Sequence, residues 1–466
     1  MTVVTSANLI TKNINIIGAG ASGLYTCYKL LHLNNSADNL SNIRLNINVW
    51  DKLPIPFGLV RNGVAPDHPE IKNCIETFKE MFDNKEDTKN TVKFIGNFTF
   101  TKKEQYEELV DKSDLLFLAT GCEKSRSYKL ENKTTSNTLL AKDIVDWYNN
   151  YPHQGEEPNK EWKTKEFWQN IKRINIIGNG NVAFDLCRLF FLSKNGKKNI
   201  DKTDINSSFV NVLSTAPLEK VNIIGRRDFI HAKFGTREFR ELWALNKYGV
   251  HGKIDSKYLP EASEVKSLSR AIAKRVQLAK KNMQAQQEEN LIPPLTWELK
   301  FLSSPYKVDE KNKILYSKTN TLDQDSLKIT STNEVEEIKN DLVILSIGTQ
   351  NDESSLFEEL EKENSNKVKR VGWLKTHGSG SIAETMLDTF PLVTKEYENM
   401  DYLNNENSNE PEDMNFLKNK KNVLTTWNGF KAVEEYERLS KQGKKCASAE
   451  EMLQIAYQSG SKLTNT

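Results

Sequence analysis

A glycine-rich turn between an apolar run and a helical pattern constrains this chain most. Residues 14–33 read INIIGAGASGLYTCYKLLHL, in which Gly18, Gly20 and Gly23 follow the spacing G-x-G-x-x-G. The pattern predicts a strand, a tight turn and a helix. Gly18 permits the turn, Gly20 lets backbone N–H groups approach a pyrophosphate, and Gly23 lets the helix lie close to the strand. We therefore expect a dinucleotide at the N-terminus of this helix.

The next apolar run, INVWD, ends in an acid, Asp51. A carboxylate at the end of a second strand can accept hydrogen bonds from a ribose 2′-hydroxyl, and it would repel a phosphate at that position. The alternative is a glycine-rich turn that binds no ligand. The flanking strand, the helix and the distal acid together favour a dinucleotide that lacks a 2′-phosphate.

A second strand-turn-helix pattern follows in residues 174–191, INIIGNGNVAFDLCRLFF. Its spacing is Gly178-x-Gly180-x-x-Ala183, and the next predicted strand, VNIIGRR, ends in Arg226 and Arg227. Two guanidinium groups at that point can pair with a 2′-phosphate through charge-assisted hydrogen bonds, and NAD offers them no such group. A solvated strand end is the alternative. One chain therefore carries an FAD-type and an NADP-type fingerprint.

Length and composition exclude several other classes. The 466 residues allow two or three domains. A net charge of +2 gives no global argument for nucleic acid. The five cysteines form no CxxC pair, which indicates a reducing compartment, no metal site and no disulfide relay. No apolar run reaches the roughly 20 residues of a membrane span. Residues 1–13 contain no acid and are compatible with a targeting segment.

Several further blocks together resemble one family. They are PFGLVR at 56–61, GVAPDHPE at 63–70, DIVDWYNNYP at 143–152, VGWLKTHGSGSI at 371–382 and WNGFKAVEEYE at 427–437. In this order, with the two glycine motifs, they resemble the adrenodoxin reductase family, the mitochondrial NADPH:ferredoxin reductases, in a fungal-type form. The resemblance covers nearly the whole chain.

The resemblance implies an α/β fold with two Rossmann-like nucleotide-binding domains. The expected FAD domain is discontinuous, formed by residues 14–122 and 349–466, and the NADP domain, residues 123–348, is inserted into it. Residues 401–422 are expected to be an exposed polar insert or linker. The implied reaction passes a hydride from NADPH to FAD and then single electrons to an adrenodoxin-like [2Fe-2S] ferredoxin, in support of iron-sulfur cluster, haem or sterol pathways.

The resemblance also implies the residues of each site. For FAD they are Gly18, Gly20, Ser22, Gly23, Asp51, Leu59, Phe100, Trp373, Gly380, Ser381 and Ile382. For NADP they are Gly178, Asn179, Gly180, Asn181, Val182, Arg226, Arg227, Glu238 and Gly380. The acid and imidazole of the DHP word, Asp67 and His68, are candidate catalytic residues near the flavin or the ferredoxin, and a structural hydrogen-bonding role for His68 is the alternative.

A basic surface is expected to dock the acidic ferredoxin, because opposite charges steer association. The candidates lie in two helical stretches: Arg237, Arg240, Arg270, Lys274 and Arg275. The alternative for these side chains is an ordinary solvated or salt-bridged helix surface. The resemblance places the protein in the mitochondrion, in the matrix or on the matrix face of the inner membrane, with peripheral membrane association left open. We expect a monomer.

One departure from the family leaves other functions open. The stretch between Gly348 and Gly372 is shorter than in the family and lacks its recognisable strand. Either an acidic helix over residues 352–363 replaces that substructure, or a deletion has weakened flavin retention. The alternatives for function are an NADPH-dependent flavin oxidoreductase with another acceptor, a degenerate scaffold that binds nucleotides without turnover, and a flavin monooxygenase, for which no pocket signature is present.

Overall fold

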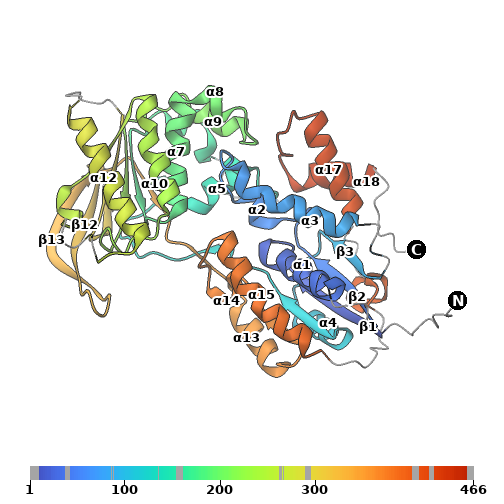
Figure 1. Ribbon diagram of the computed structural model, residues 1–466. Helices are drawn as coiled ribbons and strands as arrows, with labels where there is room; N and C mark the ends of the chain where they lie inside the picture. The colour runs from blue at the N-terminus through green and yellow to red at the C-terminus, as the bar shows by residue number, and fades with distance from the viewer. Residues whose placement is uncertain are drawn as a thin grey trace.

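Two parallel sheets organise the structure, a computed structural model drawn in Figure 1. It describes residues 10–36, 42–84, 87, 89–134, 136–153, 161–261, 265, 267–288, 295–400, 409–418 and 424–458. The first sheet has the strand order β16-β4-β1-β2-β3, and all its pairs are parallel. Its strands are β1 Ile10–Ile17, β2 Ile43–Trp50, β3 Thr91–Ile95, β4 Leu115–Leu118 and β16 Val368–Arg370.

The first strand begins earlier than the sequence indicated. Residues Ile10 to Asn13 pair with β2, and the side chains of Lys12 and Asn13 are buried. Lys12 donates to Asp114 at 3.1 Å, which explains how an amine is accommodated inside a strand. Residues 10–13, the last part of the possible targeting segment, therefore belong to the first sheet, while residues 1–9 lie outside the described residues.

Helices cover both faces of the first sheet because its strands alternate apolar side chains to the two sides. One face buries Ile14 and Ile16 under α1 Ala21–Ser36, α3 Cys74–Asp83, α15 Ile382–Glu398, α17 Trp427–Leu439 and α18 Ala449–Gln458. The other face buries Ile17 and Trp50 under α4 Lys103–Lys112 and α13 Ser354–Glu363. Elements from both ends of the chain thus share one core, as the blue and red segments of Figure 1 show.

The second sheet has the order β6-β14-β7-β8-β10-β9 and is also parallel throughout. Its strands are β6 Thr138–Leu140, β7 Arg173–Ile177, β8 Lys220–Ile224, β9 Val250–Ile254, β10 Leu295–Lys300 and β14 Leu342–Leu345. Helices pack on one face: α5 Ala141–Asn149, α7 Asn181–Asn195, α9 Ser207–Leu213, α10 Thr236–Trp243 and α12 Arg270–Glu288.

An antiparallel three-stranded sheet covers the opposite face of the second sheet. It consists of β11 Ser303–Asp309, β12 Ile314–Leu322 and β13 Ile329–Lys339. Val308, Leu315 and Ile338 of these strands are buried in one cluster with Ile177, Ile224 and Val343 of the parallel sheet. The second parallel sheet is therefore covered by helices on one face and by the antiparallel sheet on the other.

The chain crosses between the two halves at two neighbouring places. It leaves the first sheet after β4 and returns after β14, and the two crossings pair as a short antiparallel ribbon of β5 Lys124–Ser125 and β15 Thr349–Gln350. Arg126 fastens this ribbon to the returning chain by donating to the carbonyls of Thr349 at 3.0 Å and His377 at 2.7 Å.

The shortened stretch after Gly348 contains a helix and an edge strand. Helix α13 buries Phe357 and Leu360, and β16 pairs in parallel with β4. Of the two alternatives for this stretch, replacement by an acidic helix describes the structure. Because β16 completes the edge of the first sheet, the stretch is part of the first domain.

The expected polar insert is not exposed throughout. Residues 409–418 contain the short helices η5 Pro411–Asp413 and α16 Asn415–Lys418, and both Met414 and Leu417 are buried against Trp50 and its neighbours. Asn409 is buried as well and accepts a hydrogen bond from Asn15 at 2.7 Å. The expectation of an exposed linker is wrong for these residues, because the apolar residues of MNFL pack on the sheet. Residues 401–408 and 419–423 lie outside the described residues.

Three properties of the described part of the chain bear on the site. None of the described helices is both long and apolar enough to cross a bilayer. Among the same residues, no group of three or more potential metal ligands is gathered. The five cysteines are free thiols, four of them buried.

Candidate functional site

The first glycine turn is fixed by backbone packing. Gly18 has φ +111°, and a Cβ atom there would lie 2.4 Å from the carbonyl oxygen of Ala119 at the end of β4. A Cβ on Gly23 would lie 1.9 Å from the oxygen of Gly18. In contrast, a Cβ on Gly20 would meet nothing within 4 Å. Two glycines are therefore required by the turn itself, whereas Gly20 borders open space at the N-terminus of α1, where a phosphate would fit.

The second glycine turn repeats this geometry in the other sheet. Gly178 has φ +116°, and a Cβ there would lie 2.0 Å from the oxygen of Ser346 after β14. A Cβ on Gly180 would again meet nothing within 4 Å, and Ala183 is fully buried where the first motif has its third glycine. Both turns thus leave an open side at a helix N-terminus, each at the carboxyl edge of its sheet.

Asp51 follows β2 and lies beside the first turn. Its carboxylate accepts hydrogen bonds from the backbone N–H of Ala19 at 2.6 Å and of Leu53 at 2.8 Å. Burial raises the pKa of Asp51 to about 6, against the opposing effect of these two donors. The group is therefore mostly ionised at neutral pH, and each of its two oxygens can accept a further hydrogen bond.

The PFGLVR segment packs against the same glycine turn. The N–H of Phe57 donates to the oxygen of Ala19 at 2.8 Å, and a Cβ on Gly58 would lie 3.1 Å from the Cα of Gly20. Leu59 on the short helix α2 Gly58–Asn62 is 37% exposed. Leu59 is therefore available to a ligand at the turn.

Phe100 is located differently from the expectation of a direct cofactor contact. It is only 6% exposed and packs edge-on against Trp50 at 5.7 Å between ring centroids. It also contacts Phe98, Tyr106 and Phe416. Its ring belongs to the core beneath the site, because the aromatic residues of this cluster fill the space between the sheet and α4.

The returning chain brings a third element to the first turn. Gly372 has φ +60°, and a Cβ there would lie 2.4 Å from the Cβ of Ser22, so the two segments are in close contact. Trp373 donates from Nε1 to the oxygen of Gly380 at 3.0 Å, which closes the loop before α15. Ser381 and Glu384 form a capping box that engages two amides of this helix. The amides of Ile382 and Ala383, which have no intrahelical partner, remain for a ligand.

The two arginines after β8 differ in environment. Arg226 is exposed, whereas Arg227 is partly buried and its Nε has no hydrogen-bond partner among the described residues. The amide nitrogen of Asn179 is buried and unpaired in the same way. Because buried donors are normally satisfied, these two atoms indicate a missing acceptor beside the second turn. A phosphate at this position supplies that acceptor, so the residues fit a 2′-phosphorylated dinucleotide.

Glu238 borders the same site from helix α10. It is buried, and a Cβ on Gly235 would lie 2.1 Å from its Oε2. Asn181 reaches the same loop by accepting from the N–H of Gly235 at 2.8 Å. Val182 is 43% exposed on the first turn of α7. The loop before α10 is therefore held over the second glycine turn.

Asp67 and His68 lie at the contact between the two halves of the molecule. Asp67 accepts two hydrogen bonds from Arg188 on α7, at 2.7 and 2.9 Å, and Nε2 of His68 lies 2.6 Å from Oε2 of Glu241 on α10. Burial opposes ionisation of Glu241, but the hydrogen bond from His68 and the charge of Arg188 lower its pKa to about 2. Glu70 pairs with Arg237 in the same contact. The DHPE segment, residues 67–70, thus joins the first domain to helices α7 and α10 of the second.

Some of the candidate docking residues are exposed, and others already form hydrogen bonds or ion pairs within the protein. Arg275 is only 6% exposed, donates to the carbonyls of Ala232 and Phe234 at 3.1 and 2.9 Å, and lies over the ring of Phe234. The expectation that Arg275 contacts a partner is therefore wrong. Arg237 is paired with Glu241 at 3.0 Å and with Glu70. Arg240, Arg270 and Lys274 are exposed.

The sequence did not predict the carboxylates that pair with Arg188 where the two domains meet. Arg188 is a charged residue inside the apolar helix NVAFDLCRLFF, and it is buried between Asp67, Asp185 and Glu241. A lone arginine in an apolar helix is itself a signal, because a buried charge requires partners. The sequence could not show which elements supply them.

Two Rossmann-like domains, each with a glycine turn open at a helix N-terminus, define the class of oxidoreductases that bind two dinucleotides. A scan against protein-family models found no match. The probable mitochondrial NADPH:adrenodoxin oxidoreductase of Saccharomyces cerevisiae is 34% identical over 83% of this chain and 85% of its own length. The mitochondrial NADPH:adrenodoxin oxidoreductase of Salvelinus fontinalis is 29% identical over 83% of this chain and 77% of its length.

A solved structure shares the fold. The structure of Mycobacterium tuberculosis FprA in complex with NADPH matches with a TM-score of 0.80 at 25% identity, over 96% of this chain and 100% of that one. Together with the similarity to the yeast protein, this agreement covers both domains. The chain belongs to the NADPH:adrenodoxin oxidoreductase family.

Proposed function

We propose that this chain accepts a hydride from NADPH on a bound FAD and passes the electrons singly to an adrenodoxin-like [2Fe-2S] ferredoxin. The observation that carries this proposal is the pair of equivalent glycine turns, of which one is bordered by the acid Asp51 and the other by the cations Arg226 and Arg227. A dinucleotide without a 2′-phosphate suits the first turn, and one with it suits the second.

FAD is assigned to the domain formed by residues 14–122 and 349–466. Gly20 leaves room for the pyrophosphate, Asp51 accepts from the ribose, and Leu59 and Trp373 lie on the segments that border the turn. The amides of Ile382 and Ala383 would stabilise negative charge on the ring system, as a helix N-terminus does. FAD, when bound, supplies the conversion between two-electron and one-electron transfer.

NADP is assigned to residues 123–348. Gly180 and the N-terminus of α7 take its pyrophosphate, while Arg226 and Arg227 hold the 2′-phosphate through charge-assisted hydrogen bonds. Hydride transfer depends on alignment of the two rings and needs no general base. In this assignment Asp67 and His68 hold the domains together through Arg188 and Glu241.

The ferredoxin is assigned to the exposed cations of α10 and α12. Arg240, Arg270 and Lys274 lie on two helices that pack side by side (Figure 1). Charges on such a rim raise the association rate and are screened by salt. The double variant R270E/K274E should slow reduction of the ferredoxin while flavin reduction by NADPH is unchanged. K431E, on α17, is the control for a change of charge elsewhere.

The curated relatives are named mitochondrial, and we assign this chain to the mitochondrion, on the matrix side. We expect it to act as a monomer. The first experiment is a visible spectrum of the purified protein, recorded anaerobically during additions of NADH and, separately, NADPH. Bound-flavin absorbance that bleaches at a far lower concentration of NADPH supports both cofactor assignments. A colourless protein that FAD cannot reconstitute contradicts the proposal.

A further inference from the structure

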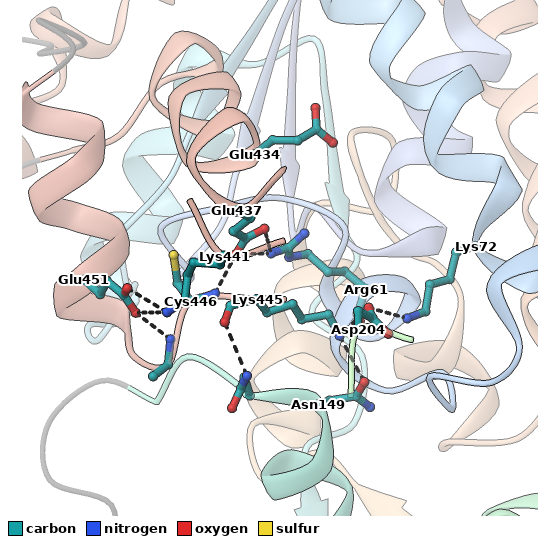
Figure 2. Close-up of polar contacts among 12 residues, drawn as sticks. Arg61, Lys72, Asn149, Asp204, Glu434, Glu437, Lys441, Lys445, Cys446 and Glu451 are labelled. Carbon is teal, nitrogen blue, oxygen red and sulfur yellow. Dashed lines mark hydrogen bonds and ion pairs between the residues drawn. The ribbon is translucent and has the colours of Figure 1, made fainter. Parts of the chain in front are cut away.

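A buried lysine near the C-terminus connects the two domains. Lys445 lies in the turn between α17 and α18, and its side chain is 3% exposed. Its Nζ donates to the carbonyl of Arg61 at 2.7 Å and to Oδ1 of Asn149 at 3.0 Å, and it lies 3.1 Å from Oδ2 of Asp204. Figure 2 shows these groups around the amine. Arg61 belongs to the first domain, whereas Asn149 and Asp204 belong to the second.

Neighbouring contacts cross the same boundary. Lys444 donates to the carbonyls of Asp201 at 2.9 Å and Thr203 at 2.6 Å, ahead of α9. Lys72 donates to Asp204 at 2.8 Å, so that one carboxylate receives two lysines of the first domain. This set of contacts, formed by Lys72, Lys444 and Lys445, is separate from the one around Arg188. The second domain therefore contacts the first at this place as well as around Arg188.

The turn that carries Lys445 is anchored within the first domain. Arg61 donates to both oxygens of Glu437 on α17, at 2.7 and 2.6 Å, and the N–H of Cys446 donates to Glu437 at 2.8 Å. Figure 2 shows Arg61 and Cys446 meeting this one carboxylate. Displacement of the second domain consequently breaks the contacts of Lys445 with Asn149 and Asp204, whereas its hydrogen bond to the carbonyl of Arg61 and the turn itself stay in place.

Each side of the contact leads to a glycine turn. Arg61 lies on α2, which begins at Gly58 beside Gly20. Asn149 ends α5, which packs on α7, and α7 begins at the second turn. The contact therefore joins α2, which lies beside the first turn, to α5, which packs on the helix that begins at the second turn.

We propose that Lys445 is a positioning residue that fixes the NADP-binding domain against the FAD-binding domain in the alignment required for hydride transfer. This inference rests on the proposed function. Reacting atoms must approach to roughly 3–3.5 Å, and a misplacement of 1 Å can cost about 100-fold in rate. A residue that sets the orientation of the domains therefore acts on the rate of the chemical step more than on the affinity for NADPH.

Protonation of Lys445 gives the contact a defined pH dependence. Burial and the charge of Lys72 lower the pKa of Lys445 to about 7, and the opposing charge of Asp204 does not restore the ordinary value of 10.5. Asp204 stays ionised because the lysines lower its pKa to about 2 despite its burial. The other charged or titratable groups that face the amine or its turn include Arg61, Glu437, Lys441, Lys444, Cys446 and Glu451.

The direction of this pH dependence follows from the number of protons that the closed and separated forms bind. With the domains separated, Lys445 is hydrated and holds its proton up to about pH 10.5, whereas in the closed contact it loses the proton above about pH 7. The separated form thus binds more protons between these values, so raising the pH from 7 toward 10 favours the closed form.

The test compares Lys445→Met with Lys441→Met in the full-length holoenzyme. Lys441 is on the same turn and pairs with Glu451 at 2.8 and 3.0 Å, within the C-terminal segment (Figure 2). Anaerobic single-turnover mixing with NADPH gives the limiting rate of flavin reduction. Roughly a tenfold lower limiting rate is expected for K445M, with the Kd of NADP⁺ changed less than about twofold, and no change for K441M.

Two further readouts separate positioning from a general structural role. In the wild type the limiting rate should rise between pH 7 and 9, and this rise should be lost in K445M. Amide hydrogen exchange in residues 142–151 and 201–206 should accelerate in K445M and remain unchanged in K441M. If K445M does not fold, Lys444→Met carries the same test with a smaller effect, because Lys444 is less buried.

The outcomes distinguish this inference from the function on which it rests. A K445M protein with the limiting rate, pH profile and exchange of the wild type would overturn the positioning role. A wild type whose flavin NADPH does not reduce would refute the proposed function, and the exchange measurement would still decide whether Lys445 holds the two domains together.

Discussion

Replacement of Arg227 by alanine should convert NADPH preference toward NADH. The guanidinium is partly buried, and its Nε lacks a partner among the described residues, so a 2′-phosphate supplies the acceptor that the protein does not. A hydrogen bond to a charged group is worth about 1.5–3 kcal/mol. Because each 1.4 kcal/mol is a factor of ten, the loss in kcat/KM for NADPH should be roughly 10- to 150-fold.

Arg226 provides the matched comparison. It is exposed, and an ion pair in water contributes only about 0–1 kcal/mol. R226A should therefore lower kcat/KM for NADPH by no more than about fivefold. Both variants should leave kcat/KM for NADH unchanged, because NADH has no phosphate at this position.

The assay is anaerobic reduction of the flavin by each nucleotide, measured as kcat/KM with wild type, R226A and R227A side by side. Equal losses with NADH and NADPH in R227A would mean that the arginine supports the fold of the turn and does not select the phosphate. A larger effect of R226A than of R227A would refute the argument from burial.

Two other predictions concern the turns and the acid. Gly178→Ala should destabilise the protein by at least about 1–3 kcal/mol in thermal unfolding, because its φ is +116° and the new Cβ would meet the oxygen of Ser346. Gly180→Ala should unfold like the wild type yet bind NADP⁺ weakly, since only the ligand occupies that space. Equal stability of the two variants would contradict this distinction. Burial raises the pKa of Asp51 to about 6, so protonation below that pH removes a ribose acceptor. FAD affinity, followed by flavin fluorescence, should weaken from pH 7.5 to 5 in the wild type and stay flat in D51N; a parallel pH dependence in both would exclude Asp51 as the cause.

The local pattern of the sequence was sufficient for the two nucleotide-binding turns. Each glycine motif lies between a buried strand and a helix, as the spacing predicted, because turn geometry and helix packing are set by residues close together in the chain. The helix Ser354–Glu363 agrees with one of the two alternatives for the acidic stretch 352–363. The start of β1 was not predicted, because the burial of Lys12 involves a hydrogen bond to the distant Asp114.

Tertiary structure decided the properties that depend on distant partners. A basic pattern cannot distinguish Lys274, which is exposed, from its neighbour Arg275, which is buried over Phe234 and hydrogen-bonded to carbonyls of another segment. The sequence predicted Met414 and Leu417 to be part of a polar linker, whereas in the structure they pack in one core cluster with Trp50.

The same distinction separates the cofactor sites from the contact between the domains. The sequence by itself determined that two dinucleotide turns exist and which charges border them, since Asp51, Arg226 and Arg227 each follow a strand whose position is readable. Only the tertiary structure brought Lys445 to Asn149 and Asp204, because these residues lie about 240 to 300 positions apart and no local pattern records which surfaces meet. Local geometry is encoded locally, whereas the partners of a buried charge are chosen by the packing of the whole chain.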